Sequence, residues 1–201
     1  MTLISEDAPE DLWVFGYGSL IWRPGFDFVE RREARLVGAH RALCIYSFVH
    51  RGTPEQPGLV LGLDRGGICR GVAYRVAAAR RRETLDYLRE REQVTSIYLE
   101  RIRQVWLKSD PGRPEAPDQV GAVCYLVDRS HRQYAGRLSL EEQLRLVAHA
   151  HGQSGPNRDY VLATVAALEE MGIRDRELHR LAERLHGGHV QGGQGAAPPR
   201  V

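Results

Sequence analysis

The chain has 201 residues, of which 42% are hydrophobic and 27% charged, proportions typical of one ordinary globular domain. Its formal net charge is +2 and its basic residues are scattered, which argues against a nucleic-acid partner. No apolar run approaches the roughly 20 residues that a membrane span needs, and residues 1–11 are acidic and lack an apolar core. We therefore expect a soluble, cytoplasmic protein that does not enter a membrane.

The cysteines and histidines give no pattern of a metal site. Cys44, Cys69 and Cys124 are odd in number, and none belongs to a CxxC pair. Each lies in an apolar, strand-like run, so we interpret them as buried hydrophobic residues, with a catalytic cysteine as the alternative. His149 and His151 are two residues apart, which places them on different faces of a helix. We expect no metal ligands.

The first 76 residues carry the pattern of strands. A leader, residues 1–11, is expected to be flexible. Four apolar or β-branched runs follow before any convincing helix: 12–15, 34–48, 59–63 and 68–76. Gly38 favours a bend or bulge in the second run, and residues 64–67 favour a hairpin between the last two. This order predicts an α+β fold whose mixed or antiparallel sheet closes toward a barrel.

The rest of the chain is predicted to form one helix, two strands and then three helices. A helix is expected over residues 79–93, then two strands and three helices: 98–107, 119–127, a helix starting at Ser139, one after Asn157, and 175–185. Ser139 and Glu142 have the spacing of a capping box. Residues 187–201 lack periodicity and are predicted to be a disordered tail, which leaves one domain over residues 12–186.

The first strand runs directly into Gly16-Tyr17-Gly18-Ser19. Glycines at such a point let the chain turn sharply and allow a ligand to approach the backbone N–H groups. A buried strand that ends in this loop is a good support for an anion or oxyanion site. The alternative is an ordinary turn, because most Gly-x-Gly-Ser strings have no function. The string also lacks the spacing of a dinucleotide-binding motif.

Glu92 stands out in the first helix. Leu85 and Leu88 mark its apolar face, and the next position on that face is residue 92. A carboxylate on an inward face is costly unless it is used or paired. A salt bridge to a neighbouring arginine is the structural alternative to a catalytic role.

Over residues 12–185 the chain resembles the ChaC-type γ-glutamylcyclotransferases, which degrade glutathione. Five strings carry the resemblance in the right order: VFGYGSLIW at 14–22, HRG at 50–52 with Pro54, Pro57 and Gly58, GVAYR at 71–75, Arg91-Glu92 with Thr95 and Tyr98, and Ser154-Gly155 with Asn157 and Tyr160. The resemblance implies a small, largely antiparallel mixed β-barrel with helices around it.

The resemblance also implies roles for particular residues. Glu92 would be the catalytic base, and Tyr160 would line the pocket of the γ-glutamyl group. Arg51 would pair with a substrate carboxylate, although an arginine beside a proline loop is more often only solvated. The γ-glutamyl group would be held by Val14, Phe15, Gly16, Tyr17, Gly18, Ser19 and Leu20. Glutathione would be converted to 5-oxoproline and Cys-Gly, with neither metal nor cofactor.

One departure and two alternatives remain. Ser96-Ile97 stands where the family has a glycine, and the added bulk is expected to narrow or redirect the pocket. The chain could instead act on other γ-glutamyl amines or dipeptides, or be a binding module without turnover. Ser19 is not expected to be a hydrolase nucleophile, because its string is not GxSxG.

Overall fold

The computed structural model describes residues 4–92, 96–112 and 118–187, except for the side chain of Glu92. The chain divides into two compact units. One, the barrel unit, comprises Met1–Ser47 and Leu59–Leu138, and the other, the helical unit, comprises Phe48–Gly58 and Ser139–Val201. Each is described by itself.

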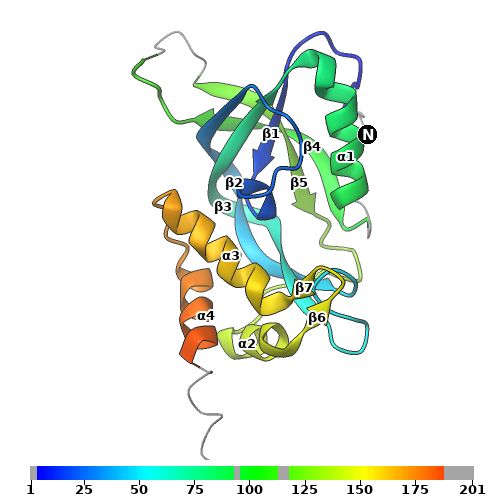
Figure 1. Cartoon of the computed structure of the whole chain (residues 1–201), viewed down its shortest axis with the longest axis vertical. Coiled ribbons are helices and arrows are strands. Elements are labelled where there is room, and N and C mark those ends of the chain that lie inside the picture. Colours follow the sequence, from blue (N-terminus) through cyan, green and yellow to red (C-terminus); the bar gives the residue numbers. More distant parts are fainter. Residues whose placement is uncertain (1–3, 93–95, 113–117, 188–201) are drawn as a thin grey trace, which may run out of the picture. The chain divides into compact units, whose positions relative to one another are not determined.

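The barrel unit is built on a closed sheet in the order β1-β3-β2-β4-β5 (Figure 1). The strands are β1 Leu12–Gly16, β2 Glu30–Ser47, β3 Gly58–Val76, β4 Tyr98–Leu107 and β5 Gln119–Val127. β1 pairs antiparallel with β3 and parallel with β5, whereas β4 and β5 pair antiparallel along their length. The barrel is therefore mixed but largely antiparallel, and the predicted fold class is confirmed.

The predicted hairpin across residues 64–67 is wrong. β3 is one strand of 19 residues that continues through this stretch. Gly66 and Gly67 have φ of +92° and +74°, which glycine adopts without a steric penalty, so the strand changes direction locally without reversing. Its neighbour β2 is 18 residues long and offers pairing over a similar length. Gly38, with φ +89°, gives β2 the irregular backbone expected there.

Helix α1, Arg81–Glu92, covers one side of the barrel (Figure 1). A 3₁₀ turn, Ala78–Arg80, precedes it. Leu85 and Leu88 are fully buried in a cluster that includes Val14 and Val123, which confirms the predicted inward face. Each buried leucine contributes on the order of 2 kcal/mol. The helix is thereby fixed against the strand that leads into the glycine loop.

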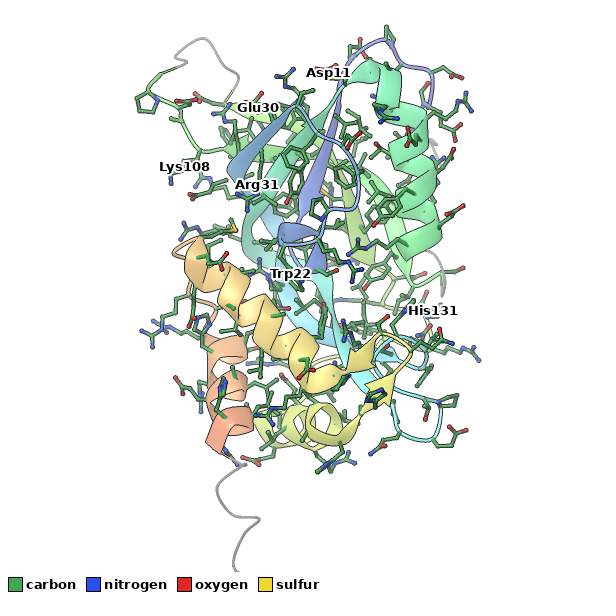
Figure 2. The ribbon with its side chains drawn as sticks, viewed as in Figure 1. Asp11, Trp22, Glu30, Arg31, Lys108 and His131 are labelled. Atoms are coloured by element: carbon green, nitrogen blue, oxygen red, sulfur yellow. The ribbon has the colours of Figure 1, made fainter. Side chains whose placement is uncertain are left out.

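The leader is packed rather than loose over residues 4–11. Ile4 is buried in the same cluster as Leu85, and the Arg81 Nε donates to Ser5 O at 2.7 Å. Arg75 binds Asp11 and Glu30, each at 2.8 Å, and Figure 2 shows these two acids at the same end of the barrel unit. The hydrogen bond from Arg75 lowers the pKa of Asp11. Helix and strand arginines thus anchor a segment whose composition suggested no structure.

The helical unit contains α2 Leu140–His149, α3 Asn157–Glu170 and α4 Arg176–Gly187, with a short hairpin of β6 His151–Gly152 and β7 Gly155–Pro156. The capping box is formed: the Ser139 hydroxyl accepts from Glu142 N, and the Glu142 carboxylate accepts from Ser139 N. Of the predicted tail, residues 188–201 lie outside the described part. Among the described helices, none has the length and apolar character needed to cross a membrane.

Candidate functional site

The glycine loop, residues 16–21, follows β1 and passes into a 3₁₀ turn, Ser19–Ile21. Gly71 on β3 lets another strand lie directly against its start, because a Cβ there would be 2.3 Å from Gly16 O. Trp22, labelled in Figure 2, directly follows the loop. Its side chain is partly exposed to solvent. The glycines therefore serve close backbone approach at this point.

The carbonyl groups of the loop, from Tyr17 to Ile21, all accept hydrogen bonds. The donors are Arg41 Nε to Tyr17 O at 2.5 Å, Ile21 N to Gly18 O at 2.9 Å, Arg23 N to Ser19 O at 2.8 Å, and the Tyr74 hydroxyl to Leu20 O at 2.8 Å and Ile21 O at 3.1 Å. Within the described part of the chain, no residue accepts from the amides of Gly18 or Ser19. The carbonyls of this loop are therefore occupied, whereas the Gly18 and Ser19 amides have no acceptor among the described residues, which suits an anionic ligand.

Arg91 connects this loop to α1. Its Nη2 donates to Ser19 Oγ at 2.8 Å, while its Nη1 donates to Arg23 O at 2.9 Å and to the Tyr87 hydroxyl at 2.7 Å. Gly25, with φ +77°, allows this approach, because a Cβ there would lie 2.0 Å from the Tyr87 hydroxyl oxygen. The last turn of α1 is therefore fastened to the loop.

Glu92 is the final residue of α1, directly after Arg91. Its side chain lies outside the described part of the structure, so its place on the inward face stays a prediction. The backbone position is informative nonetheless. Because Arg91 holds the last helical turn against Ser19, residue 92 belongs to the element that is tied to the glycine loop.

The remaining predicted loop residues differ in their environment. Val14 and Phe15 are completely buried, and Leu20 is 4% exposed. Val14 and Leu20 belong to the core cluster beneath α1. Tyr17 is buried as well, and its hydroxyl donates to Tyr125 O at 3.3 Å. These side chains support the loop, and a direct contact with substrate stays a prediction for each of them.

Arg51 and Tyr160 lie together in the helical unit. The Arg51 guanidinium carbon is 5.3 Å from the centre of the Tyr160 ring. Its Nη1 donates to Ser154 O at 2.6 Å and to Pro156 O at 3.2 Å. Arg51 is therefore a tie between two segments of this unit rather than a merely solvated side chain. The proposed contact with a substrate carboxylate would be additional to these bonds.

Ser96 has a left-handed backbone, with φ +55°. Glycine adopts this conformation freely, whereas a residue with a side chain pays about 1–2 kcal/mol. A glycine at this position would adopt the same backbone without that strain. Ile97 is fully buried with Cys44, Ile45 and Val127. Whether the two residues narrow a pocket stays a prediction.

The cysteines behave as buried hydrophobic residues. All three are buried, and none of them forms a disulfide. Burial raises the pKa of Cys44 to about 12, with the Asp64 carboxylate adding to the effect, and burial likewise raises the pKa of Cys124 to about 12. A thiol with so high a pKa is a poor nucleophile at neutral pH. Among the described residues, no group of three histidine, cysteine or acidic side chains could hold a metal ion.

Sequence reasoning missed the side chains that hold the loop. Arg41 and Tyr74 come from other strands, and only the folded barrel brings them to the loop carbonyls. Tyr74 and Arg91 belong to two of the motifs that carry the family resemblance, GVAYR and Arg91-Glu92. Arg41 gave no signal, because it lies between motifs in an ordinary strand.

Residues 12–187 match the family described as ChaC-like protein. The chain belongs to the ChaC-like family. A glutathione-specific gamma-glutamylcyclotransferase of Escherichia coli is 36% identical over 180 residues, covering 90% of this chain and 75% of that protein. Gamma-glutamylcyclotransferase 2-3 of Arabidopsis thaliana is 34% identical over 182 residues, covering 87% of this chain and 88% of the relative.

A solved structure agrees with the fold. The crystal structure of a γ-glutamyl cyclotransferase specific to glutathione from yeast has a TM-score of 0.81 at 24% identity, covering 89% of this chain and 96% of that one. The family match extends over parts of both compact units of this ChaC-like chain. The single domain over residues 12–186 stays a prediction.

Proposed function

We propose that the chain is a glutathione-specific γ-glutamylcyclotransferase, which converts glutathione to 5-oxoproline and Cys-Gly. The observation that carries the proposal is the 36% identity to the Escherichia coli enzyme of that name over 90% of the chain. The glycine loop supports it independently, because none of the described residues accepts from the amides of Gly18 and Ser19, which can therefore donate to a negatively charged oxygen. The partner is then a small molecule.

The proposed reaction is an intramolecular aminolysis. The α-amino nitrogen of the γ-glutamyl group attacks its own γ-carbonyl carbon and forms the five-membered lactam. The amide bond to the cysteine nitrogen then breaks. The α-ammonium nitrogen loses two protons in becoming the lactam N–H, and the cysteine nitrogen takes up two in becoming the ammonium group of Cys-Gly. Holding both reacting groups in one folded rotamer removes a barrier that can reach ~7–11 kcal/mol in good cases. No metal, cofactor or water is consumed.

Glu92 is the proposed base and acid. The attacking amine is an ammonium at neutral pH, so one carboxylate has to remove its proton before attack and return it to the leaving nitrogen. The support is the position of residue 92 at the end of α1, next to the arginine that contacts Ser19. General acid–base catalysis of this kind contributes typically ~10²–10⁴-fold.

The glycine loop is the proposed holder of substrate charge. The amides of Gly18 and Ser19 would donate to the tetrahedral oxyanion or to the α-carboxylate of the γ-glutamyl group. Tyr160 is proposed to line the pocket, and Arg51 to add a charge-assisted contact to a carboxylate. We also infer a cytoplasmic location, which the three buried cysteines, none of them in a disulfide, support.

Activity on other γ-glutamyl amines is the second candidate, and the Arabidopsis thaliana relative, whose name does not mention glutathione, favours keeping it. Mass spectrometry on purified protein separates the two. We expect glutathione to yield 5-oxoproline and Cys-Gly, and γ-glutamyl-alanine to remain intact. Turnover of γ-glutamyl-alanine but not of glutathione would support the second candidate function.

Glu92→Gln tests the base in the same assay. We expect the variant to retain glutathione binding and lose at least about 100-fold in kcat. Glu90→Gln, a neighbouring carboxylate on the same helix, is the matched control and should keep its activity. Equal rates for the two variants would contradict the role of Glu92. If the unmodified protein converts neither glutathione nor γ-glutamyl-alanine, the result would favour a binding module without catalytic activity.

A further inference from the structure

Arg41 lies on β2, between the sequence motifs, yet its guanidinium reaches the glycine loop. Its Nε donates to Tyr17 O at 2.5 Å and its Nη2 to Arg70 O at 2.6 Å. The side chain belongs to a residue that is only 8% exposed. A buried charge is costly, so its persistent partners matter to the fold around it. Here one partner is a peptide group of the loop itself.

The peptide between Tyr17 and Gly18 is planar and trans, so its C=O and N–H point in opposite directions. Because Arg41 binds the carbonyl, the Gly18 N–H points away from the guanidinium. Gly18 is buried, and none of the described residues accepts from its amide. A buried N–H requires an acceptor, because leaving it unpaired costs about 1–3 kcal/mol. A ligand oxygen would satisfy it.

Without a restraint this peptide could turn over. Glycine has no Cβ, so rotation of the peptide that precedes it meets little steric resistance. Turning it would direct the carbonyl oxygen to the place of the N–H and remove the donor. A positive charge on the carbonyl side opposes that rotation, and it also polarises the peptide toward a stronger N–H donor.

We propose that Arg41 is a positioning residue that fixes the Tyr17–Gly18 peptide with the Gly18 N–H directed at a negatively charged oxygen of the substrate. The inference rests on the proposed function, because it assumes that the glycine loop binds the γ-glutamyl group. Arg41 acts through the peptide and does not touch the reacting atoms.

Arg41→Met removes the guanidinium while keeping the length of the side chain. Arg32→Met is the matched control, since Arg32 lies on the same strand, is 9% exposed, and donates to the Lys108 carbonyl at 2.5 Å. Both variants lose a buried arginine bound to backbone, and we expect similar falls in their melting temperatures. Only Arg41→Met should lose about 10- to 100-fold in kcat/KM for glutathione, less than deletion of an oxyanion donor, ~10²–10³.

Two further readouts separate positioning from a general structural effect. The pH profile of kcat/KM should keep its inflections in Arg41→Met while its plateau falls, because the base is unchanged. A fall in kcat at constant KM would identify the oxyanion as the ligand of Gly18, whereas a rise in KM would identify the α-carboxylate. Either result supports the proposal.

Equal kcat/KM in folded Arg41→Met and Arg32→Met would overturn it. Should the methionine variants fail to fold, Arg41→Gln and Arg32→Gln take their place, because the amide can still satisfy one carbonyl without carrying charge. We again expect a lower kcat/KM for the Arg41 variant than for the Arg32 variant. Equal values of kcat/KM would refute the role of Arg41. An unmodified protein without cyclotransferase activity would instead refute the proposed function, so the two failures are distinguishable.

Discussion

In the glycine loop of the barrel unit, Arg41 and Arg91 reach in from β2 and α1 and hold backbone and hydroxyl oxygens of the loop. In the helical unit, Arg51 lies on a predicted binding segment and reaches out to the carbonyls of Ser154 and Pro156. Both regions use guanidinium groups to shape backbone. They differ in the groups beside the arginines. The glycine loop has the Gly18 and Ser19 amides, from which none of the described residues accepts, whereas Arg51 lies over the Tyr160 ring.

An arginine that belongs to a sequence motif can therefore hold backbone groups and need not bind substrate. Arg41 and Arg91 bind oxygens of the glycine loop, so the groups there that could donate to a substrate are the Gly18 and Ser19 amides. Arg51 is at once a structural tie and the proposed carboxylate contact, so its two functions are harder to separate by mutation. Substitutions that act on backbone position alone therefore give cleaner tests.

The largest effect is expected for Gly58→Ala, which breaks the arrangement around Arg51 without removing its charge. The new Cβ would lie 2.0 Å from Arg51 O and 2.9 Å from Asn157 Oδ1. Such overpacking should cost about 3 kcal/mol of unfolding free energy in urea titrations. Gly187→Ala is the control, because no described atom lies within 4 Å of that Cβ. A loss below about 0.5 kcal/mol at Gly58 would show that the segment yields easily.

At Asp64 an arginine, Arg129, binds a carboxylate instead of backbone carbonyls. Burial alone would raise the pKa of Asp64, but hydrogen bonds from Arg129 at 2.5 Å and Tyr134 at 2.8 Å outweigh burial, and the pKa is lowered. A lowered pKa stabilises the fold above the ordinary aspartate value of about 3.9, and this stability disappears as the pH falls through the folded pKa.

Asp64→Asn should therefore cost about 1–2 kcal/mol at pH 7, and the gap to the unmodified protein should narrow below about pH 4. Urea titrations at neutral and acidic pH measure it. Arg32→Met is the comparison, because its Nη2 donates to the Lys108 carbonyl, which does not titrate, so the loss of this bond contributes equally at both pH values. A constant gap for Asp64→Asn would mean that the ion pair contributes little.

Arg91→Met tests the fastening of the glycine loop to α1. Loss of the bonds to Ser19, Arg23 and Tyr87 should reduce kcat/KM for glutathione about 10-fold, or about 1.4 kcal/mol. Ser19→Ala removes only one of these bonds and should have a smaller effect. If both variants lose the same activity, the hydroxyl contact alone explains the role of Arg91.

The smallest effect is expected at Ser96, and it is a gain. Ser96→Gly should stabilise the barrel unit by about 0.5–1 kcal/mol, because relief of the left-handed strain exceeds the added entropy of the unfolded chain. Thermal unfolding measures the shift. Ser130→Gly, at a residue whose φ is not positive, should not stabilise. A loss of stability at Ser96 would show that its backbone carries no strain.

Local features were predictable from the sequence because they depend on neighbours in the chain. The period of Leu85 and Leu88 gave the inward face of α1, the Ser139–Glu142 spacing gave a capping box, and the apolar runs gave β4 and β5. The family strings pointed to the glycine loop as a candidate site. Each of these signals is complete within about ten residues.

Tertiary structure alone decided what holds the candidate site. Arg41 and Tyr17 are 24 residues apart, Arg91 and Ser19 are 72 apart, and Arg51 and Ser154 are 103 apart. Arg51 and Arg91 belong to family strings and Arg41 does not, but no local pattern shows which backbone group or hydroxyl any of the three binds. The single strand through Gly66 and Gly67 was decided in the same way, because glycine at positive φ is compatible with a hairpin turn and with a continuous strand, and in the folded barrel β3 continues beside the equally long β2.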